Sequence, residues 1–135
     1  MSDNSISTTS HTFGCARCTA IPKTPFQLVR TLLKDVHEDY TLDQCVDCGQ
    51  IYLQHCKEIG RFDGEDDLWT RWVPLTSQER DRIEELFPLE GENWEKVSIL
   101  NEFLHNRRRL VKHPYGKYYW TDEPNDACDL VRPGW

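Results

Sequence analysis

The feature that most constrains the fold of this chain is a pair of C-x2-C motifs, Cys15–Cys18 and Cys45–Cys48, the second followed directly by Gly49. Each motif places two thiolates at one tight turn, and a structural zinc ion takes four such ligands in a tetrahedral arrangement. A glycine after the second motif relieves steric crowding where the chain reverses. The spacing therefore predicts one structural Zn²⁺ bound by Cys15, Cys18, Cys45 and Cys48.

The composition of the N-terminal segment predicts cysteines that bind metal and do not form disulfides. Residues 1–12 are rich in Ser and Thr and lack the apolar segment of a signal peptide, and no apolar run of the chain approaches the length of a membrane span. We therefore expect a cytoplasmic protein without a membrane segment, whose six cysteines stay reduced. The alternative is a set of buried or redox cysteines, but neither motif has the strand-to-helix context of a thioredoxin-type site.

The length of 135 residues fits one domain, and its hydrophobic share of 38% is low for a globular protein. A bound zinc ion would offset part of that deficit, because its binding free energy becomes folding free energy. We expect a disordered tail over 1–12, a single zinc-stabilised α+β domain over 13–121 and an irregular C-terminal tail over 122–135.

The first half of the domain is predicted to contain one helix and three strands. Apolar residues recur at helical spacing over 24–34, and Pro25 suits the first position of a helix there. Residues 40–45 are expected to lead into the second cysteine motif as a strand. Strands over 50–59 and 68–74 follow from their Ile, Tyr and Trp content, and together they predict an antiparallel hairpin.

The second half is predicted to be mainly helical. Thr76 and Glu79 form a capping box, which opens a helix with a buried stripe of Ile83, Leu86 and Phe87. A longer helix is expected over 93–110, and a last short strand over 115–121. The buried stripe of the longer helix would contain Trp94, Val97, Leu100, Phe103 and Leu104.

The chain resembles the zinc-ribbon group in the four cysteines, in Gly49 and in the hairpin that follows them, over residues 13–74. The resemblance implies a structural metal and a ribbon-like local fold. It implies no particular function, because zinc ribbons serve in transcription, translation, enzymes and protein interaction. The expected fold class is α+β, with a zinc-ribbon-like module, its antiparallel β-hairpin and C-terminal helices.

The charge distribution favours a protein partner. The net charge is −7, and residues 63–102 are strongly acidic. The segment 63–67 does not match the spacing of a calcium-binding loop, so we interpret it as a solvated hairpin tip or as a contact surface for a basic partner. The expected function is that of a small non-enzymatic zinc-binding protein that acts through protein–protein interaction, such as an inhibitor or immunity-type protein.

A basic and aromatic segment over 107–120 supports a second hypothesis, a zinc ribbon that binds nucleic acid. Arginines can clamp phosphates and aromatic rings can stack on bases. The competing explanation is that the cations balance the dipole at the end of the predicted helix over 93–110, followed by an aromatic strand in the core. The basic candidates for partner contact are Arg107, Arg108, Arg109 and Lys112.

Trp69 and Trp72 are further candidates for partner contact. Three residues apart in a strand, they should point to opposite faces, so we expect one in the core and the other exposed. Cys56 is expected to be a half-buried strand cysteine; the alternatives are a spare ligand or a redox thiol. A zinc-dependent enzyme ranks last, because four cysteines leave no open position for water.

Overall fold

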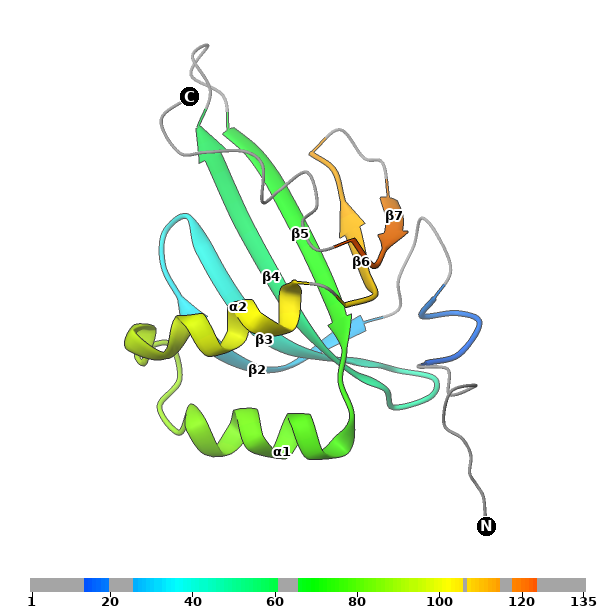
Figure 1. Cartoon of the computed structure of the whole chain (residues 1–135), viewed down its shortest axis with the longest axis horizontal. Coiled ribbons are helices and arrows are strands. Elements are labelled where there is room, and N and C mark those ends of the chain that lie inside the picture. Colours follow the sequence, from blue (N-terminus) through cyan, green and yellow to red (C-terminus); the bar gives the residue numbers. More distant parts are fainter. Residues whose placement is uncertain (1–13, 20–25, 61–65, 106, 115–117, 124–135) are drawn as a thin grey trace.

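A six-stranded antiparallel sheet forms the centre of the protein in the computed structural model, which describes residues 14–19, 26–60, 66–105, 107–114 and 118–123. Each strand pairs with its neighbours in the sequence, so the sheet order is β2-β3-β4-β5-β6-β7 (Figure 1). The strands are β2 (Phe26–Lys34), β3 (Glu38–Cys45), β4 (Ile51–Gly60), β5 (Asp66–Pro74), β6 (Arg109–Lys112) and β7 (Tyr118–Thr121).

Two helices lie over one face of the sheet: α1 (Ser77–Leu86) and α2 (Val97–Leu104), the second preceded by the 3-10 turn η1 (Trp94–Lys96) (Figure 1). The predicted capping box is present at the start of α1. Thr76 Oγ1 accepts from the Glu79 N–H at 3.1 Å, and the Glu79 carboxylate accepts from the Thr76 N–H at 2.9 Å. The α+β fold class, the hairpin of β4 and β5 and the capped helix are therefore confirmed.

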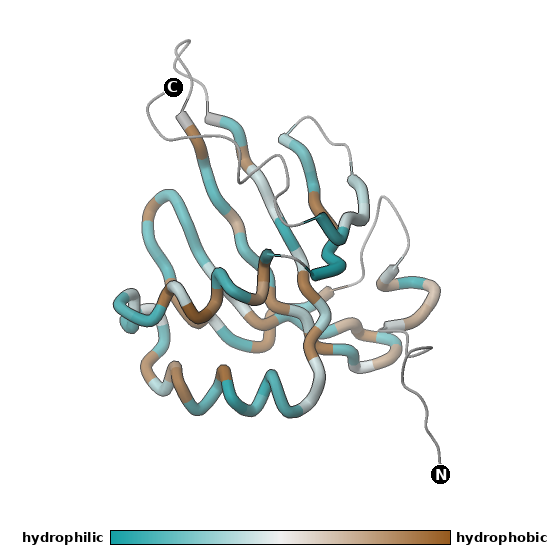
Figure 2. The backbone as a smooth tube through the Cα atoms, viewed as in Figure 1, coloured by the Kyte–Doolittle hydropathy of each residue, from teal (hydrophilic) through white to brown (hydrophobic). Residues whose placement is uncertain are grey.

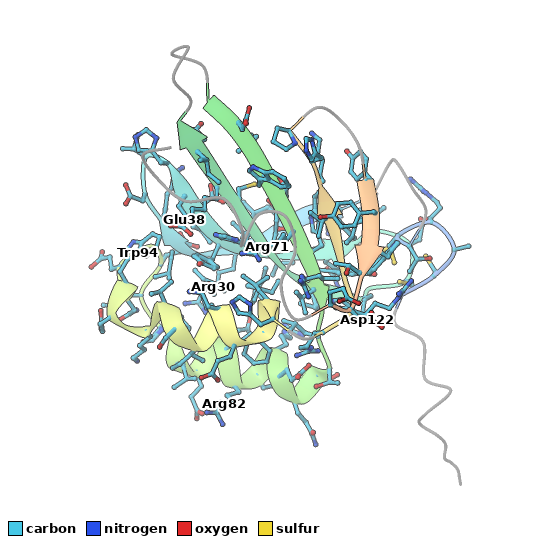
Figure 3. The ribbon with its side chains drawn as sticks, turned by 45° about the horizontal axis from the view of Figure 1, so that its top comes forward. Arg30, Glu38, Arg71, Arg82, Trp94 and Asp122 are labelled. Carbon is cyan, nitrogen blue, oxygen red and sulfur yellow. The ribbon has the colours of Figure 1, made fainter. Side chains whose placement is uncertain are left out.

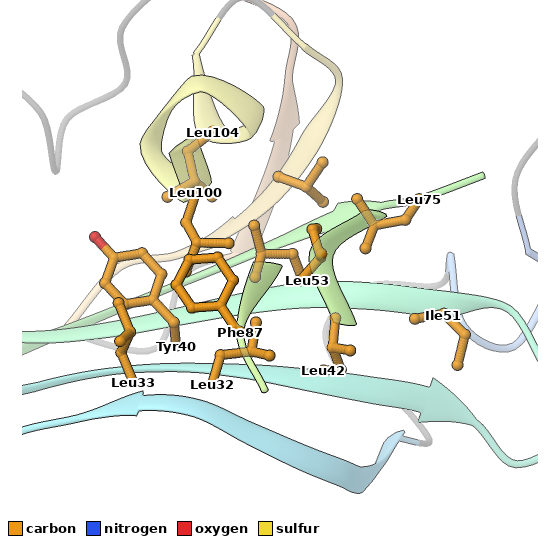
Figure 4. Packing of buried hydrophobic residues seen from close by; sticks show 12 residues of the cluster. Leu32, Leu33, Tyr40, Leu42, Ile51, Leu53, Leu75, Phe87, Leu100 and Leu104 are labelled. Atoms are coloured by element: carbon orange, nitrogen blue, oxygen red, sulfur yellow. The ribbon is translucent and has the colours of Figure 1, made fainter. Parts of the chain in front are cut away.

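The main core lies between this face of the sheet and the helices. α1 is largely hydrophilic, with a few hydrophobic positions, and those positions turn toward the sheet (Figure 2). Both stripes predicted for the helices contribute to this core. Its fully buried side chains include Leu32, Leu33, Leu42, Leu53, Val73, Ile83, Phe87, Leu100 and Leu104 (Figure 4).

The helix predicted over 24–34 is wrong, because Phe26–Lys34, the part of it that the structure describes, forms the edge strand β2. The pairing of β2 with β3 has register shifts between Leu28 and Arg30 and between Thr31 and Leu33. Such irregularities interrupt the alternation of a regular strand, so the adjacent Leu32 and Leu33 are both buried. Leu28 and Val29 complete the helix-like apolar spacing in the sequence but are exposed on this edge strand.

The helix predicted over 93–110 is too long. α2 ends at Leu104, because His105 has an extended backbone, and no basic residue lies in its last turn. Arg109 starts β6, which pairs with β5 and buries Leu110 and Val111 completely. This burial outweighs the helical propensity of the segment, so the arginines do not balance the dipole of α2.

Strand β7 lies inside the predicted final strand over 115–121, of which 115–117 are outside the described residues. The tail over 1–12, the acidic segment 63–65, Cys128 and residues 124–135 also fall outside them. Within the part of the chain that the structure describes, no helix is long and apolar enough to cross a membrane.

Candidate metal centre

The four predicted ligands lie together at one end of the sheet. The Sγ atoms of Cys15, Cys18, Cys45 and Cys48 are all within 4.8 Å of one another, and the Cys15–Cys45 and Cys18–Cys48 pairs are both 3.8 Å apart. Zn–S bonds of about 2.3 Å at tetrahedral angles separate the sulfurs by about 3.8 Å. A disulfide would bring two sulfurs to about 2 Å, so the spacing fits ligands of one metal ion.

The second motif occupies the turn between β3 and β4. Cys45 ends β3, and its N–H and C=O are bonded to Gln50 O and Gly49 N, both at 3.0 Å. Gly49 has a φ of +81°, a left-handed conformation that glycine adopts without strain. The Asp47 N–H points at Cys45 Sγ from 3.4 Å, so the turn itself supplies a donor to the sulfur.

The first motif is closed by a side chain in addition to the backbone. Cys15 O accepts from the Thr19 N–H at 3.1 Å and from the Thr19 hydroxyl at 2.7 Å. Thr19 thus takes the place that Gly49 has in the second motif. The Cys15 N–H points at Cys18 Sγ from 3.2 Å, so this turn also directs a backbone donor toward a sulfur.

Gly14 allows the first motif to approach the sheet closely. Its φ is +78°, and a Cβ at this position would lie 2.4 Å from Cys18 Sγ and 2.7 Å from Tyr52 Oη. Sequence reasoning missed this residue. The signal was present, since a glycine directly precedes the first motif as Gly49 directly follows the second.

Three contacts hold the first motif to the rest of the protein. Cys18 Sγ and Tyr52 Oη lie 3.2 Å apart, and Trp120 Nε1 donates to Thr19 O at 3.1 Å. Arg17 forms an ion pair with Asp47 at 2.9 Å, which links the two motifs at the surface. The cysteine cluster is therefore anchored on β4 and β7 as well as on the β3–β4 turn.

The electrostatics of the cluster favour a bound cation. The backbone N–H of Cys18 lowers the pKa of the Cys15 thiol to about 7, whereas burial raises the pKa of the Cys18 thiol. Several thiolates at this spacing repel one another unless a positive ion lies among them. A metal ion would therefore bind with release of protons.

The predicted basic contact residues do not form one surface. Arg109 is fully buried, and its Nη1 donates to Arg107 O at 2.8 Å. Arg107 binds Glu79 of α1 at 2.8 Å and Pro74 O at 3.0 Å. Arg107 also lies over the Phe103 ring at 5.4 Å. On the β6–β7 hairpin, Arg108 extends over the Trp120 ring at 5.3 Å and Lys112 over the Tyr118 ring at 5.9 Å.

Both candidate tryptophans are buried, so the expectation of one exposed tryptophan is wrong. They do lie on opposite faces, as their spacing predicted. Trp69 packs with Ile59 and Val111, and Trp72 packs in the cluster around Cys18. Trp69 is 5% exposed and Trp72 is 7% exposed, because β6 extends the sheet beyond β5 and adds side chains on both faces.

Cys56 is separate from the four-cysteine cluster and half-buried in β4, as predicted. Its Sγ lies 3.4 Å from Thr70 Oγ1 and 3.3 Å from Gln54 Oε1. Burial raises the pKa of its thiol. These contacts are those of a packed strand cysteine.

A buried polar network across β3, β4 and β5 was missed by the sequence analysis. His55 is 3% exposed; its Nε2 lies 2.6 Å from Glu38 Oε2 and its Nδ1 lies 2.8 Å from Arg71 Nη2. Glu38 and Arg71 are labelled in Figure 3. Burial lowers the pKa of His55, so the neutral ring donates to Glu38 and accepts from Arg71. The signal was the inward parity that His55 shares with Ile51 and Leu53.

Comparison with known protein families, with curated protein sequences and with solved structures finds no match to this chain. The function must therefore be argued from the geometry of the site.

Proposed function

We propose that this protein is a small, non-enzymatic cytoplasmic protein that binds one structural Zn²⁺ and acts by binding another protein. The sulfur spacing of 3.8 Å carries the first part of the proposal. Four cysteines fill a tetrahedral shell, so the ion would have no position for water and would serve the fold. For the same reason a zinc-dependent enzyme ranks last.

The zinc-ribbon likeness supports this assignment. In the ribbon interpretation the β3–β4 turn carries one C-x2-C motif and the segment before β2 carries the other. The ion would then join residues 14–19 to the sheet, in addition to the contacts that Cys18, Thr19 and Arg17 make with Tyr52, Trp120 and Asp47. Its role would be to fix the end of the sheet that presents the aromatic cluster around Tyr52 and Trp72.

The proposed partner is a basic protein. The net charge of −7 disfavours general association with nucleic acid and favours a basic surface. An inhibitor or immunity-type protein would use its acidity to mask such a surface and to speed association.

Capture from the native host tests the proposed partner class. The immobilised protein, purified with its zinc retained, should retain a basic protein that dissociates with added salt. Retention of nucleic acid alone would contradict the proposal.

The second candidate function, nucleic-acid binding, is favoured by the placement of Arg108 and Lys112 over aromatic rings of the β6–β7 hairpin. Nucleic acid bound at physiological salt would show an affinity that falls steeply with salt, because phosphate contacts release counterions. The double change Arg108→Gln and Lys112→Gln should then abolish the binding. Binding that the double variant retains would reject this use of the hairpin.

A further inference from the structure

The face of the sheet opposite the helices contains a hollow of about 430 Å³. Strict alternation along β3 turns Tyr40 and Leu42 toward the helices and turns Thr41 and Asp43 into this hollow. Four strands, β2 to β5, contribute to its lining. The lining residues used below are Phe26, Asp39, Thr41, Asp43, Gln54 and Trp72.

Asp43 is the central polar group of the hollow, and it is only 4% exposed. Its carboxylate accepts from Thr41 Oγ1 at 2.9 Å and from Gln54 Nε2. Both donors are neutral, and among the described residues no cation forms an ion pair with Asp43. Burial raises the pKa of Asp43, as expected for a carboxylate without a compensating charge. Two donors hold the carboxylate in place and leave lone pairs for further donors.

A second carboxylate adds negative charge to the same hollow. Asp39 lies four residues before Asp43 on β3, so the two are about 13 Å apart along the strand. That separation is too large for both to bind one metal ion. Lys34 attracts the Asp39 carboxylate, but burial still raises its pKa. Lys34 acts on Asp39, and Lys112 acts on Cys56 of the same lining. Asp43, which has no ion-pair partner among the described residues, is therefore the place where an added cation would bind.

The wall of the hollow is aromatic and contains an N–H donor beside Asp43. The rings of Phe26 and Trp72 lie 5.8 Å apart and are tilted by 44°. Trp72 is 7% exposed, and its Nε1 has no hydrogen-bond partner. This N–H is close enough to Asp43 to favour the carboxylate, yet it makes no full hydrogen bond. A ligand that brings a hydrogen-bond acceptor into the hollow could therefore accept a full hydrogen bond from Trp72 Nε1.

We propose that this hollow binds an arginine side chain of the protein partner, an inference that rests on the proposed function. The guanidinium donates to Asp43 and stacks against Phe26 and Trp72, and Trp72 Nε1 donates to a main-chain carbonyl of the partner. A planar guanidinium fits both features, because it pairs with carboxylates in two parallel bonds and stacks on aromatic faces. Lysine offers neither the plane nor the fork.

Titration with a small arginine derivative tests the proposal. The probe is Nα-acetyl-arginine N-methylamide, and the readout is the indole N–H resonance of Trp72, assigned by its loss in Trp72→Phe. The resonance should shift saturably with the probe. The citrulline analogue, which has the same shape without the charge, should bind at least about tenfold more weakly, since bonds to charged groups are the stronger ones.

Two variants with the same change in net charge locate the contact. Asp43→Asn should lower the affinity for the arginine probe by about tenfold or more. Asp81→Asn, on the exposed side of α1, should leave its affinity unchanged. If Asp43→Asn does not fold, the relative affinities of the natural protein for the arginine and citrulline probes still test whether the hollow selects a guanidinium.

Several outcomes would overturn the inference. These are no saturable shift of the Trp72 resonance, equal binding of citrulline, or full affinity in Asp43→Asn. A host protein that binds the natural protein and folded Asp43→Asn equally would reject the arginine site and leave the proposed function standing. Absence of any protein partner, with the arginine probe bound as described, would reject the proposed function instead.

Discussion

Gly14 shows how closely single residues control the metal centre. Its neighbours Cys18 Sγ and Tyr52 Oη fill the space in which any other residue would place a Cβ, at 2.4 and 2.7 Å. Thr19 closes the same turn with its hydroxyl. The residues around the cysteines are therefore as specific to the site as the ligands.

Gly14→Ala should destabilise the protein by about 2 kcal/mol or more, because it adds a steric clash to the strain of a positive φ. Gly91→Ala is the matched control, since Gly91 has the same φ of +78° but no atom within 3.8 Å of the added Cβ. Urea denaturation with zinc retained measures both. Equal losses in the two variants would mean that the approach of Cys18 and Tyr52 is not close in solution.

Cys45→Ser should disrupt the fold, because it removes one ligand and with it much of the free energy that zinc supplies to folding. Cys56→Ser should lower stability by only about 1 kcal/mol, because it replaces a packed thiol outside the cluster. Thermal melts of the two variants give the comparison. Similar melting temperatures would show that the cluster contributes little or that Cys56 is a ligand.

At the scale of elements, strand β6 gives the consecutive residues Arg107, Arg108 and Arg109 different structural environments. Arg109 belongs to a strand and is fully buried, while Arg108 is exposed over the Trp120 ring. We therefore expect Arg109 to contribute much more to stability than Arg108.

Arg109→Gln should lower the free energy of unfolding by about 2–4 kcal/mol, because a buried side chain loses its packing and hydrogen bonds. Arg108→Gln should lower it by less than about 1 kcal/mol, the usual worth of an exposed cation–π contact. Urea unfolding of both variants tests the difference. Losses of the same small size would mean that the burial of Arg109 contributes little to stability in solution.

His55 couples β3, β4 and β5, and its lowered pKa makes stability depend on pH. Below about pH 6.5 the unfolded chain protonates this histidine while the folded protein resists it, so the free energy of unfolding falls as pH drops. The fall is at most about 1.4 kcal/mol per pH unit. His55→Gln should show a smaller loss than the natural protein between pH 7.5 and 5.5. An identical pH dependence would exclude His55 as its source.

For the whole molecule, short-range patterns were sufficient for much of the architecture. The C-x2-C spacing identified all four clustered cysteines, and the Ile, Tyr and Trp content of two neighbouring segments identified the β4–β5 hairpin. The errors arise where distant pairing decides: β2 is a strand because it pairs with β3, and β6 because it pairs with β5. The hollow around Asp43 was not predictable, because four strands must assemble before it exists.

The central claim is that one zinc ion holds the two cysteine motifs together. Zinc K-edge X-ray absorption, on protein purified without added metal, tests it most directly when combined with elemental analysis. The account predicts one zinc per chain with four sulfur neighbours at about 2.3 Å. A folded protein without zinc, or a zinc ion with nitrogen or oxygen ligands in place of sulfur, would contradict it.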